Sequence, residues 1–165
     1  MKYAGIDEFE ITNGLNVGIS VYTQGCPHHC PNCFNPETWD FNGGSDWTVE
    51  EENKVIALLN NPYIKRLTIL GGEPLIERNK EPLRGFLSRV RELYPNKEIW
   101  LYTGDLYENI KDTFYDVVRY VDVLVDGEYV DGLRDITLKF RGSSNQRIID
   151  VQKSLKENTI VKKEI

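Results

Sequence analysis

The stretch NVGISVYTQGCPHHCPNC, residues 16–33, joins a strand-like segment to a loop that holds every cysteine of the chain. Apolar and other side chains alternate over residues 16–23, as they do in a β-strand. We expect this segment to enter a sheet just ahead of the cysteines. Both histidines of the chain, His28 and His29, lie in the same loop. The sequence therefore gathers its soft metal ligands at the end of one predicted strand.

Three cysteines, Cys26, Cys30 and Cys33, have C-x-x-x-C-x-x-C spacing, which can present three thiolates to one polynuclear cluster. Structural zinc normally takes four protein ligands, and a ferredoxin-type cluster takes four cysteines. His28 and His29 would strain this short loop if they joined both flanking cysteines on one ion. We therefore favour a 4Fe-4S cluster with one iron left free for a substrate or cofactor, ahead of zinc and of free buried thiols.

Length and charge limit the class of protein. The 165 residues, 40% of them hydrophobic, are enough for one core, and the net charge of −6 argues against a protein that binds nucleic-acid phosphates. A membrane-spanning helix needs about 18 consecutive apolar residues, and no apolar stretch of the chain is that long. The amino terminus also lacks the apolar segment of a signal sequence. An odd number of closely spaced cysteines fits metal ligation in a reducing compartment. We expect a soluble cytoplasmic protein whose partner is a protein or small molecule.

Short apolar runs follow the cysteine loop at residues 66–70, 98–102 and 121–125, and each predicts a buried strand. Between them, Thr48 to Glu51 has the form of a capping box, and helical periodicity runs from Pro82 towards Pro95 and again over residues 106–117. Strands separated by such helices normally form right-handed βαβ units. The pattern predicts a parallel sheet covered by helices.

Glycine follows each of these three predicted strands, in the pairs Gly71-Gly72, Thr103-Gly104 and Asp126-Gly127. Ligands gather at the carboxyl ends of parallel strands, and glycine allows the backbone to approach a ligand closely. For any single pair, a simple turn is the more ordinary reading. Because all three pairs fall at the same edge as the cysteine loop, the pattern favours a site there.

The cysteine loop, together with GGEP at residues 71–74, resembles the radical S-adenosylmethionine superfamily. More narrowly, GCPHHCPNCFNPETW, GGEPL, VDVLVDGEYV and FRGSSNQRIIDV are similar to the anaerobic ribonucleoside-triphosphate reductase activating proteins. The similarity extends from about Ile11 to Val151. It implies a single radical S-adenosylmethionine domain over residues 1–151, followed by a charged tail, residues 152–165, to which we assign no structure.

The resemblance also implies a fold. A complete eight-fold α/β barrel needs about 200 to 250 residues, more than this chain has. We therefore predict an α/β fold in the form of an incomplete TIM-like barrel, with mostly parallel strands and an open side. Such an opening suits a macromolecular substrate.

In this family, a 4Fe-4S cluster and S-adenosylmethionine together generate a 5′-deoxyadenosyl radical, which removes a hydrogen atom from a glycine of the partner. The resemblance implies an oxidoreductase that installs this glycyl radical on the large anaerobic ribonucleotide reductase subunit. A flavodoxin- or ferredoxin-type donor would supply the electron, and neither nucleic acid nor membrane would take part. No side chain beyond the cluster and cofactor site is expected to be catalytic.

By resemblance, the methionine amino group would be held at Gly71, Gly72, Glu73 and Pro74. The residues expected near the rest of the cofactor are Asn32, Cys33, Phe34, Thr103 and Asp126. Taken alone, Asp126 reads better as a turn-stabilising residue, and RGSSNQR, residues 141–147, as a polar turn. Two alternatives stay open: an activase of another glycyl radical enzyme, such as a formate-lyase-like protein, and a non-catalytic zinc or iron-sulfur module.

Overall fold

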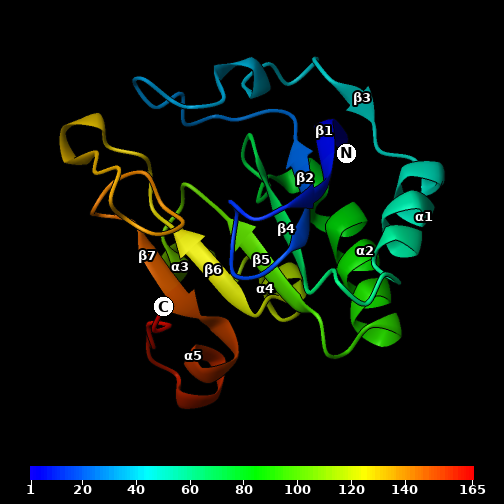
Figure 1. Cartoon of the computed structure of the whole chain (residues 1–165). Coiled ribbons are helices and arrows are strands. Elements are labelled where there is room, and N and C mark those ends of the chain that lie inside the picture. The colour runs from blue at the N-terminus through cyan, green and yellow to red at the C-terminus, as the bar shows by residue number, and fades with distance from the viewer.

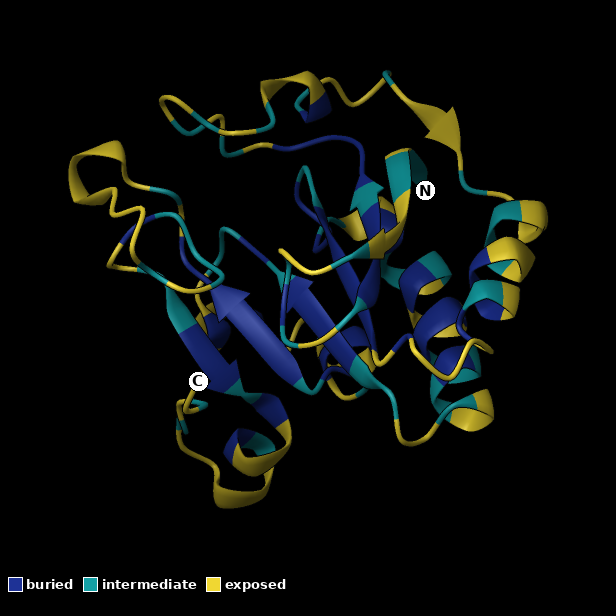
Figure 2. Cartoon of the chain, viewed as in Figure 1, coloured by how far each residue is buried: buried dark blue, intermediate teal, exposed yellow.

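The computed structural model describes residues 1–165 and contains a seven-stranded sheet with the strand order β3-β1-β2-β4-β5-β6-β7 (Figure 1). The strands are β1 (Lys2–Glu10), β2 (Gly18–Thr23), β3 (Ser45–Asp46), β4 (Arg66–Gly71), β5 (Glu98–Tyr102), β6 (Val123–Asp126) and β7 (Arg147–Asp150). The central strands are buried along most of their length, whereas many residues of the loops beyond their carboxyl ends are exposed (Figure 2).

The four central strands, β2, β4, β5 and β6, pair in parallel, as the alternation of strands and helices predicted. The register of β2 against β4 runs from Gly18 opposite Arg66 to Thr23 opposite Gly71. Both edges of the sheet differ from the prediction, because β1 pairs antiparallel with β2 and β3, and β7 pairs antiparallel with β6. The parallel centre places the ends of β2, β4, β5 and β6 along one edge.

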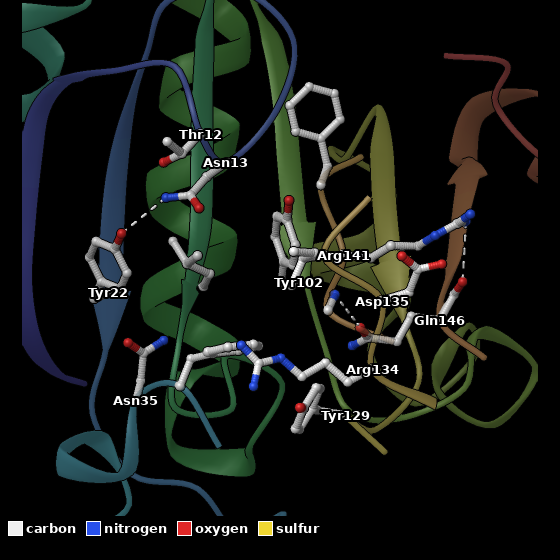
Figure 3. A pocket seen from close by; sticks show the side chains of 15 residues that line it. Thr12, Asn13, Tyr22, Asn35, Tyr102, Tyr129, Arg134, Asp135, Arg141 and Gln146 are labelled. Carbon is white, nitrogen blue, oxygen red and sulfur yellow. Dashed lines mark hydrogen bonds between the residues drawn. The ribbon is translucent and has the colours of Figure 1, made fainter. Parts of the chain in front are cut away.

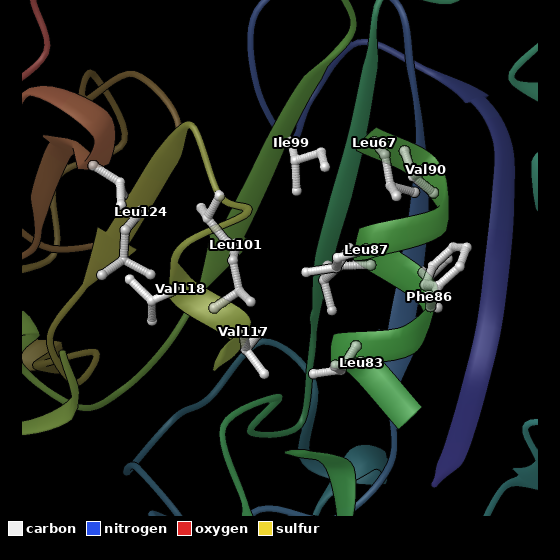
Figure 4. Close-up of a cluster of buried hydrophobic side chains, with 14 of the residues drawn as sticks. Leu67, Leu83, Phe86, Leu87, Val90, Ile99, Leu101, Val117, Val118 and Leu124 are labelled. Atoms are coloured by element: carbon white, nitrogen blue, oxygen red, sulfur yellow. The ribbon is translucent and has the colours of Figure 1, made fainter. Parts of the chain in front are cut away.

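One face of the sheet carries the main hydrophobic core, in which residues of all five α-helices pack against the strands. The helices are α1 (Val49–Leu58), α2 (Lys80–Leu93), α3 (Tyr107–Ile110), α4 (Tyr115–Val118) and α5 (Val151–Glu157), with 3-10 turns η1 (Pro36–Thr38), η2 (Glu77–Asn79) and η3 (Asp131–Leu133). Helix α2 turns Leu83, Leu87 and Val90 towards the strands that carry Leu67 and Ile99 (Figure 4).

The opposite face of the sheet, called the polar face below, carries the buried polar residues Arg66 and Thr68. Its apolar cluster has only four buried residues, none of them from a helix. Successive strand residues point to opposite faces, so Arg66 and Thr68 face away from the helical core that contains Leu67. Arg66 is fully buried and donates hydrogen bonds to Glu10 Oε1 at 2.7 Å and to Leu15 O at 3.1 Å. These bonds hold the segment after β1 across this face.

Three elements differ from the sequence prediction. Strand β1 was not predicted, because its residues are mostly charged or half-buried and it is held by pairing with β2 and β3. The helical pattern over residues 106–117 is divided between α3 and α4 by a turn at residues 111–114. The tail predicted over residues 152–165 begins inside α5 and returns to the sheet through a bridge between Lys162 and Ile149. Domain and tail are therefore continuous in structure.

The sheet ends at β3 on one side and at β7 on the other, and residues 161–163 of the C-terminal segment pair with the outer edge of β7. One wall of a barrel would also have helices on its outer face and a polar cavity on its inner face. The incomplete barrel stays a prediction. No helix in this structure combines the length and apolarity needed to cross a bilayer.

Candidate metal and cofactor site

The cysteine loop, residues 24–35, leaves the end of β2 and folds over the carboxyl edge of the sheet. Cys26, Cys30 and Cys33 all border one cavity of about 160 Å³. Cys26 is buried, whereas Cys30 and Cys33 are partly exposed, and none of the three forms a disulfide. The spacing in the sequence thus brings all three thiols to one space.

Without a metal, the surroundings of the thiols favour their neutral forms. Burial raises the pKa of Cys26 and of Cys30, so a bound metal would have to stabilise their thiolate forms. The backbone N–H of Asn35 donates to Cys33 Sγ at 3.4 Å, a type of hydrogen bond that tunes iron-sulfur clusters.

The three sulfurs are not gathered as closely as the ligands of a single zinc ion would be. With Zn–S bonds of about 2.3 Å, a tetrahedral zinc ion would hold its sulfurs about 4 Å apart. The only set of His, Cys, Asp or Glu residues whose ligand atoms all lie within 4.8 Å of one another is His28, Glu73 and Asp105. At least one pair of the three sulfurs is therefore farther apart than 4.8 Å.

The GGEP turn, residues 71–74, packs directly on the chain that leads into the cysteine loop. Gly72 N donates to Thr23 O at 2.9 Å, and Glu73 N donates to Gly25 O at 2.8 Å. A Cβ atom on Gly71 would lie 2.5 Å from Thr23 N, and one on Gly72 would collide with the carbonyl oxygen of Gly25. The two glycines are needed for this close contact, which brings the turn against the cysteine loop.

Glu73 is almost fully buried, at 1% exposure, and both of its carboxylate oxygens are occupied. Oε1 accepts a hydrogen bond from Gly104 N at 2.7 Å and lies 2.8 Å from His28 Nε2. Oε2 accepts hydrogen bonds from Thr103 Oγ1 at 2.8 Å and from Leu75 N at 3.0 Å. The carboxylate thus joins the end of β4 to the end of β5.

His28 extends this network to the third strand end. Its Nδ1 lies 2.9 Å from Glu128 Oε1, just beyond β6. The hydrogen bond with Glu73 is the main cause that raises the pKa of His28 to about 9, so the ring is protonated at neutral pH. Sequence reasoning weighed this histidine only as a zinc donor, and its carboxylate partners lie 45 and 100 residues away along the chain.

The structure brings most of the predicted site residues to the cysteine cavity. Those that line it are Cys26, Cys30, Cys33, Phe34, Gly71, Gly72, Glu73 and Thr103. The lining also includes aromatic and amide side chains that sequence reasoning missed, among them Trp39, Tyr102 and Gln146. Trp39 and Gln146 belong to stretches that carry the family resemblance, but neither was assigned to the site, and Tyr102 ends a predicted strand.

Three predicted residues do not line this cavity. Asn32 donates from Nδ2 to Asp131 Oδ2 at 2.9 Å and so ties the cysteine loop to the chain beyond β6. Pro74 contributes its carbonyl oxygen to a hydrogen bond from the side chain of Asn79. Both residues hold the walls of the site together.

Asp126, also outside the cavity lining, is fully buried and satisfied within the protein. Its carboxylate accepts hydrogen bonds from Tyr107 N at 2.8 Å and from Arg147 Nε at 2.9 Å. Asp126 forms an ion pair with Arg147 between β6 and β7, and the neighbouring Gly127 borders the cavity, so a contact of Asp126 with a cofactor stays a prediction.

A larger cavity of about 550 Å³ adjoins the cysteine cavity on the polar face of the sheet (Figure 3). Residues that line both cavities are Phe34, Asn35, Leu70, Tyr102, Tyr129 and Gln146. Phe34 is 60% exposed, and its ring lies 5.0 Å from that of Tyr129. The two cavities thus form neighbouring parts of one concave surface.

RGSSNQR forms the turn that closes this surface. Gln146 accepts hydrogen bonds at Oε1 from Gly142 N and Ser143 N, and donates from Nε2 to Gly127 O at 3.0 Å. The segment therefore supports the end of β6, and Arg141 and Gln146 line the larger cavity.

Comparison with known proteins agrees with this geometry. A family model described as "4Fe-4S single cluster domain" matches residues 12–149, a range that contains all three cysteines and the GGEP turn. An anaerobic ribonucleoside-triphosphate reductase-activating protein of Salmonella typhi is 37% identical over 148 residues, with 88% of this chain and 96% of the relative covered. The protein of the same name from Enterobacteria phage T4 is 36% identical, with 90% of this chain and 93% of the relative covered. Its counterpart from Escherichia coli (strain K12) is 36% identical, with 88% and 96% covered. The cysteine site, the matching iron-sulfur domain and the extent of these similarities together show that the chain belongs to the family of anaerobic ribonucleoside-triphosphate reductase-activating proteins.

Proposed function

We propose that this protein activates the anaerobic ribonucleoside-triphosphate reductase by installing a glycyl radical on its large subunit. Bound together, a 4Fe-4S cluster and S-adenosylmethionine would supply one-electron cleavage of a carbon–sulfur bond, releasing methionine and a 5′-deoxyadenosyl radical. A flavodoxin- or ferredoxin-type donor provides the electron. One hydrogen atom then passes from the partner's glycine to the radical, leaving a glycyl radical and 5′-deoxyadenosine. We place the reaction in the cytoplasm, where thiols stay reduced.

One observation carries the proposal: the chain's only three cysteines border the same cavity as the GGEP turn. Cys26, Cys30 and Cys33 would hold a four-iron cluster by three ligands, which would leave one iron free for a cofactor. The residues around this cavity would bind and orient the cofactor. The backbone of Gly71 and Gly72 forms the cavity wall next to the cysteines. Because Glu73 already accepts four hydrogen bonds, we assign binding of the methionine amino group to the backbone of the turn.

Burial of the site supports radical chemistry. The side chains of Thr103 and Glu73 are at most 5% exposed, and Leu70 and Tyr102 contribute apolar surface next to them. These buried walls cover the strand-end side of the site, so exclusion of water from a reactive intermediate would be completed by the cofactor and the partner on the open side. The larger cavity beside it offers space for the rest of the cofactor and for a segment of the partner.

The open side of the sheet supports a macromolecular substrate. No helix packs on the polar face, and the cavity of about 550 Å³ there is bordered by residues 134–136 and 140–142. We propose that this face is the open side of an incomplete barrel and that the glycine-bearing segment of the reductase enters here.

The test is anaerobic incubation of the reconstituted protein with S-adenosylmethionine, a reductant and the large reductase subunit. Electron paramagnetic resonance should then record a glycyl signal, and the signal should be absent when S-adenosylmethionine is omitted. A formate-lyase-like partner offered in parallel separates the alternative activase. Native protein with stoichiometric zinc and no iron would overturn the proposal.

A further inference from the structure

His28 joins the cysteine loop to two different strand ends. Nε2 lies 2.8 Å from Glu73 Oε1 in the GGEP turn, and Nδ1 lies 2.9 Å from Glu128 Oε1 beyond β6. The side chain is only 12% exposed. Both ring nitrogens are thus used, and they point away from each other towards carboxylates on separate segments.

The packing around the ring leaves little freedom. A Cβ atom added to Gly104 would lie 2.7 Å from His28 Cδ2, so the ring rests directly on the backbone after β5. Asp105 approaches the same side of the ring, with Oδ1 3.8 Å from Nε2. The imidazole therefore contacts the chain that follows β4, β5 and β6 at once.

Glu73 transmits this constraint to the GGEP turn. Its carboxylate accepts from Gly104 N, Thr103 Oγ1 and Leu75 N in addition to its contact with His28. A carboxylate offers about four lone-pair sites, so Glu73 has no remaining capacity for a ligand. It serves as a junction within the protein, and His28 is the one partner that comes from the cysteine loop.

We propose that His28 is a positioning residue, which fixes the cysteine loop in register with the GGEP turn through Glu73 and Glu128. The inference rests on the proposed function, because the turn is where S-adenosylmethionine would bind beside the cysteine-held cluster. The cysteines alone account for holding iron. Backbone hydrogen bonds from Gly72 and Glu73 hold the start of the loop, and His28 fixes its middle against the same turn. Its loss should therefore weaken cofactor binding without removing the cluster.

His29 offers a matched control in the same loop. It is exposed, and its ring stacks on Trp39 with centroids 4.5 Å apart, away from the carboxylates. His28→Ala and His29→Ala are reconstituted anaerobically, and iron per chain is measured first. S-adenosylmethionine is then titrated, and binding is followed through the change it causes in the electron paramagnetic resonance signal of the reduced cluster.

We expect both variants to hold the wild-type amount of iron. The dissociation constant for S-adenosylmethionine should rise about tenfold or more in His28→Ala and stay at the wild-type value in His29→Ala. Added imidazole should restore part of the affinity of His28→Ala, because the vacated space opens on the cysteine cavity, and should not improve His29→Ala.

Equal affinity in the two variants would overturn the positioning role. So would loss of iron from His28→Ala in proportion to its loss of binding, since this would make the residue a support for the cluster itself. Glu128→Gln keeps the ring and weakens only its outer contact, and it should raise the dissociation constant in the same direction by a smaller factor. If the wild type binds no S-adenosylmethionine, the proposed function fails, and that result is distinct from failure of the inference.

Discussion

Replacing Glu10 by alanine should cost this protein a large part of its stability, because it leaves a buried cation without its counter-ion. The Arg66 side chain has no exposed surface and the Glu10 side chain is only 10% exposed, and their charged atoms lie 2.7 Å apart. Glu10 also accepts hydrogen bonds from Ser20 Oγ at 2.6 Å and Asn13 N at 3.0 Å. Removal of the carboxylate breaks all of these contacts at once.

The size of the effect follows from burial. Breaking a buried ion pair by removing one partner costs about 3–5 kcal/mol. Arg66 keeps hydrogen bonds to Leu15 O and Asn16 O, so we expect the lower end of that range, about 3 kcal/mol. With a urea m-value of about 2 kcal/mol per molar, the unfolding midpoint should fall by about 1.5 M.

Urea unfolding of the iron-free full-length chain, followed by circular dichroism, measures this shift without a contribution from cluster loss. Glu8→Ala on the same strand is the control, because the Glu8–Lys54 pair is more than half exposed and should leave the midpoint unchanged. The double variant Glu10→Leu with Arg66→Met removes the orphan charge and should recover part of the loss. Equal midpoints for Glu10→Ala and Glu8→Ala would refute the reasoning.

The Glu10 carboxylate should also make the free energy of unfolding depend on pH. Burial alone would raise the pKa of Glu10, but hydrogen bonds from Arg66, Ser20 and Asn13 outweigh it and leave the pKa below its ordinary value of 4.5. The stabilisation is therefore complete above pH 4.5 and is lost as the pH falls through the lower folded-state pKa. The stability gap between wild type and Glu10→Ala should be full at neutral pH and narrow in acid, and a gap that is constant with pH would contradict this assignment.

Other changes test the site and the fold separately. Cys30→Ala should lose iron and stop cleavage of S-adenosylmethionine, and continued release of methionine under reducing conditions would contradict the ligand assignment. Gly72→Val should lower both iron content and the urea midpoint, since its Cβ meets the carbonyl oxygen of Gly25, whereas Gly132→Ala, with nothing within 4 Å, should change neither. Gly85→Ala, inside α2 with an open environment, should raise the free energy of unfolding by about 0.5–1 kcal/mol in the same assay.

Much of the sheet could be predicted from local pattern. Strand β5 covers the predicted residues 98–102, and β4 extends the predicted 66–70 by Gly71 alone. These strands are buried on both faces, and burial of that kind requires a short continuous apolar run that stands out in a sequence. The capping box at Thr48 also formed as predicted, because its hydrogen bonds join residues only a few positions apart. Strand β1 lacks such a pattern, since it takes its conformation from pairing with its neighbours.

That three cysteines share one short loop and that a fourth is absent can be read directly from the residue spacing. What surrounds the three thiols depends on contacts between segments that are distant in the chain. Glu73 proved to be a junction within the protein, Asp126 the partner of Arg147, and His28 the link to Glu128, 100 residues away. Side chains so far apart in the chain meet because four parallel strands end at one edge, and which of them then pair depends on how the strand ends pack.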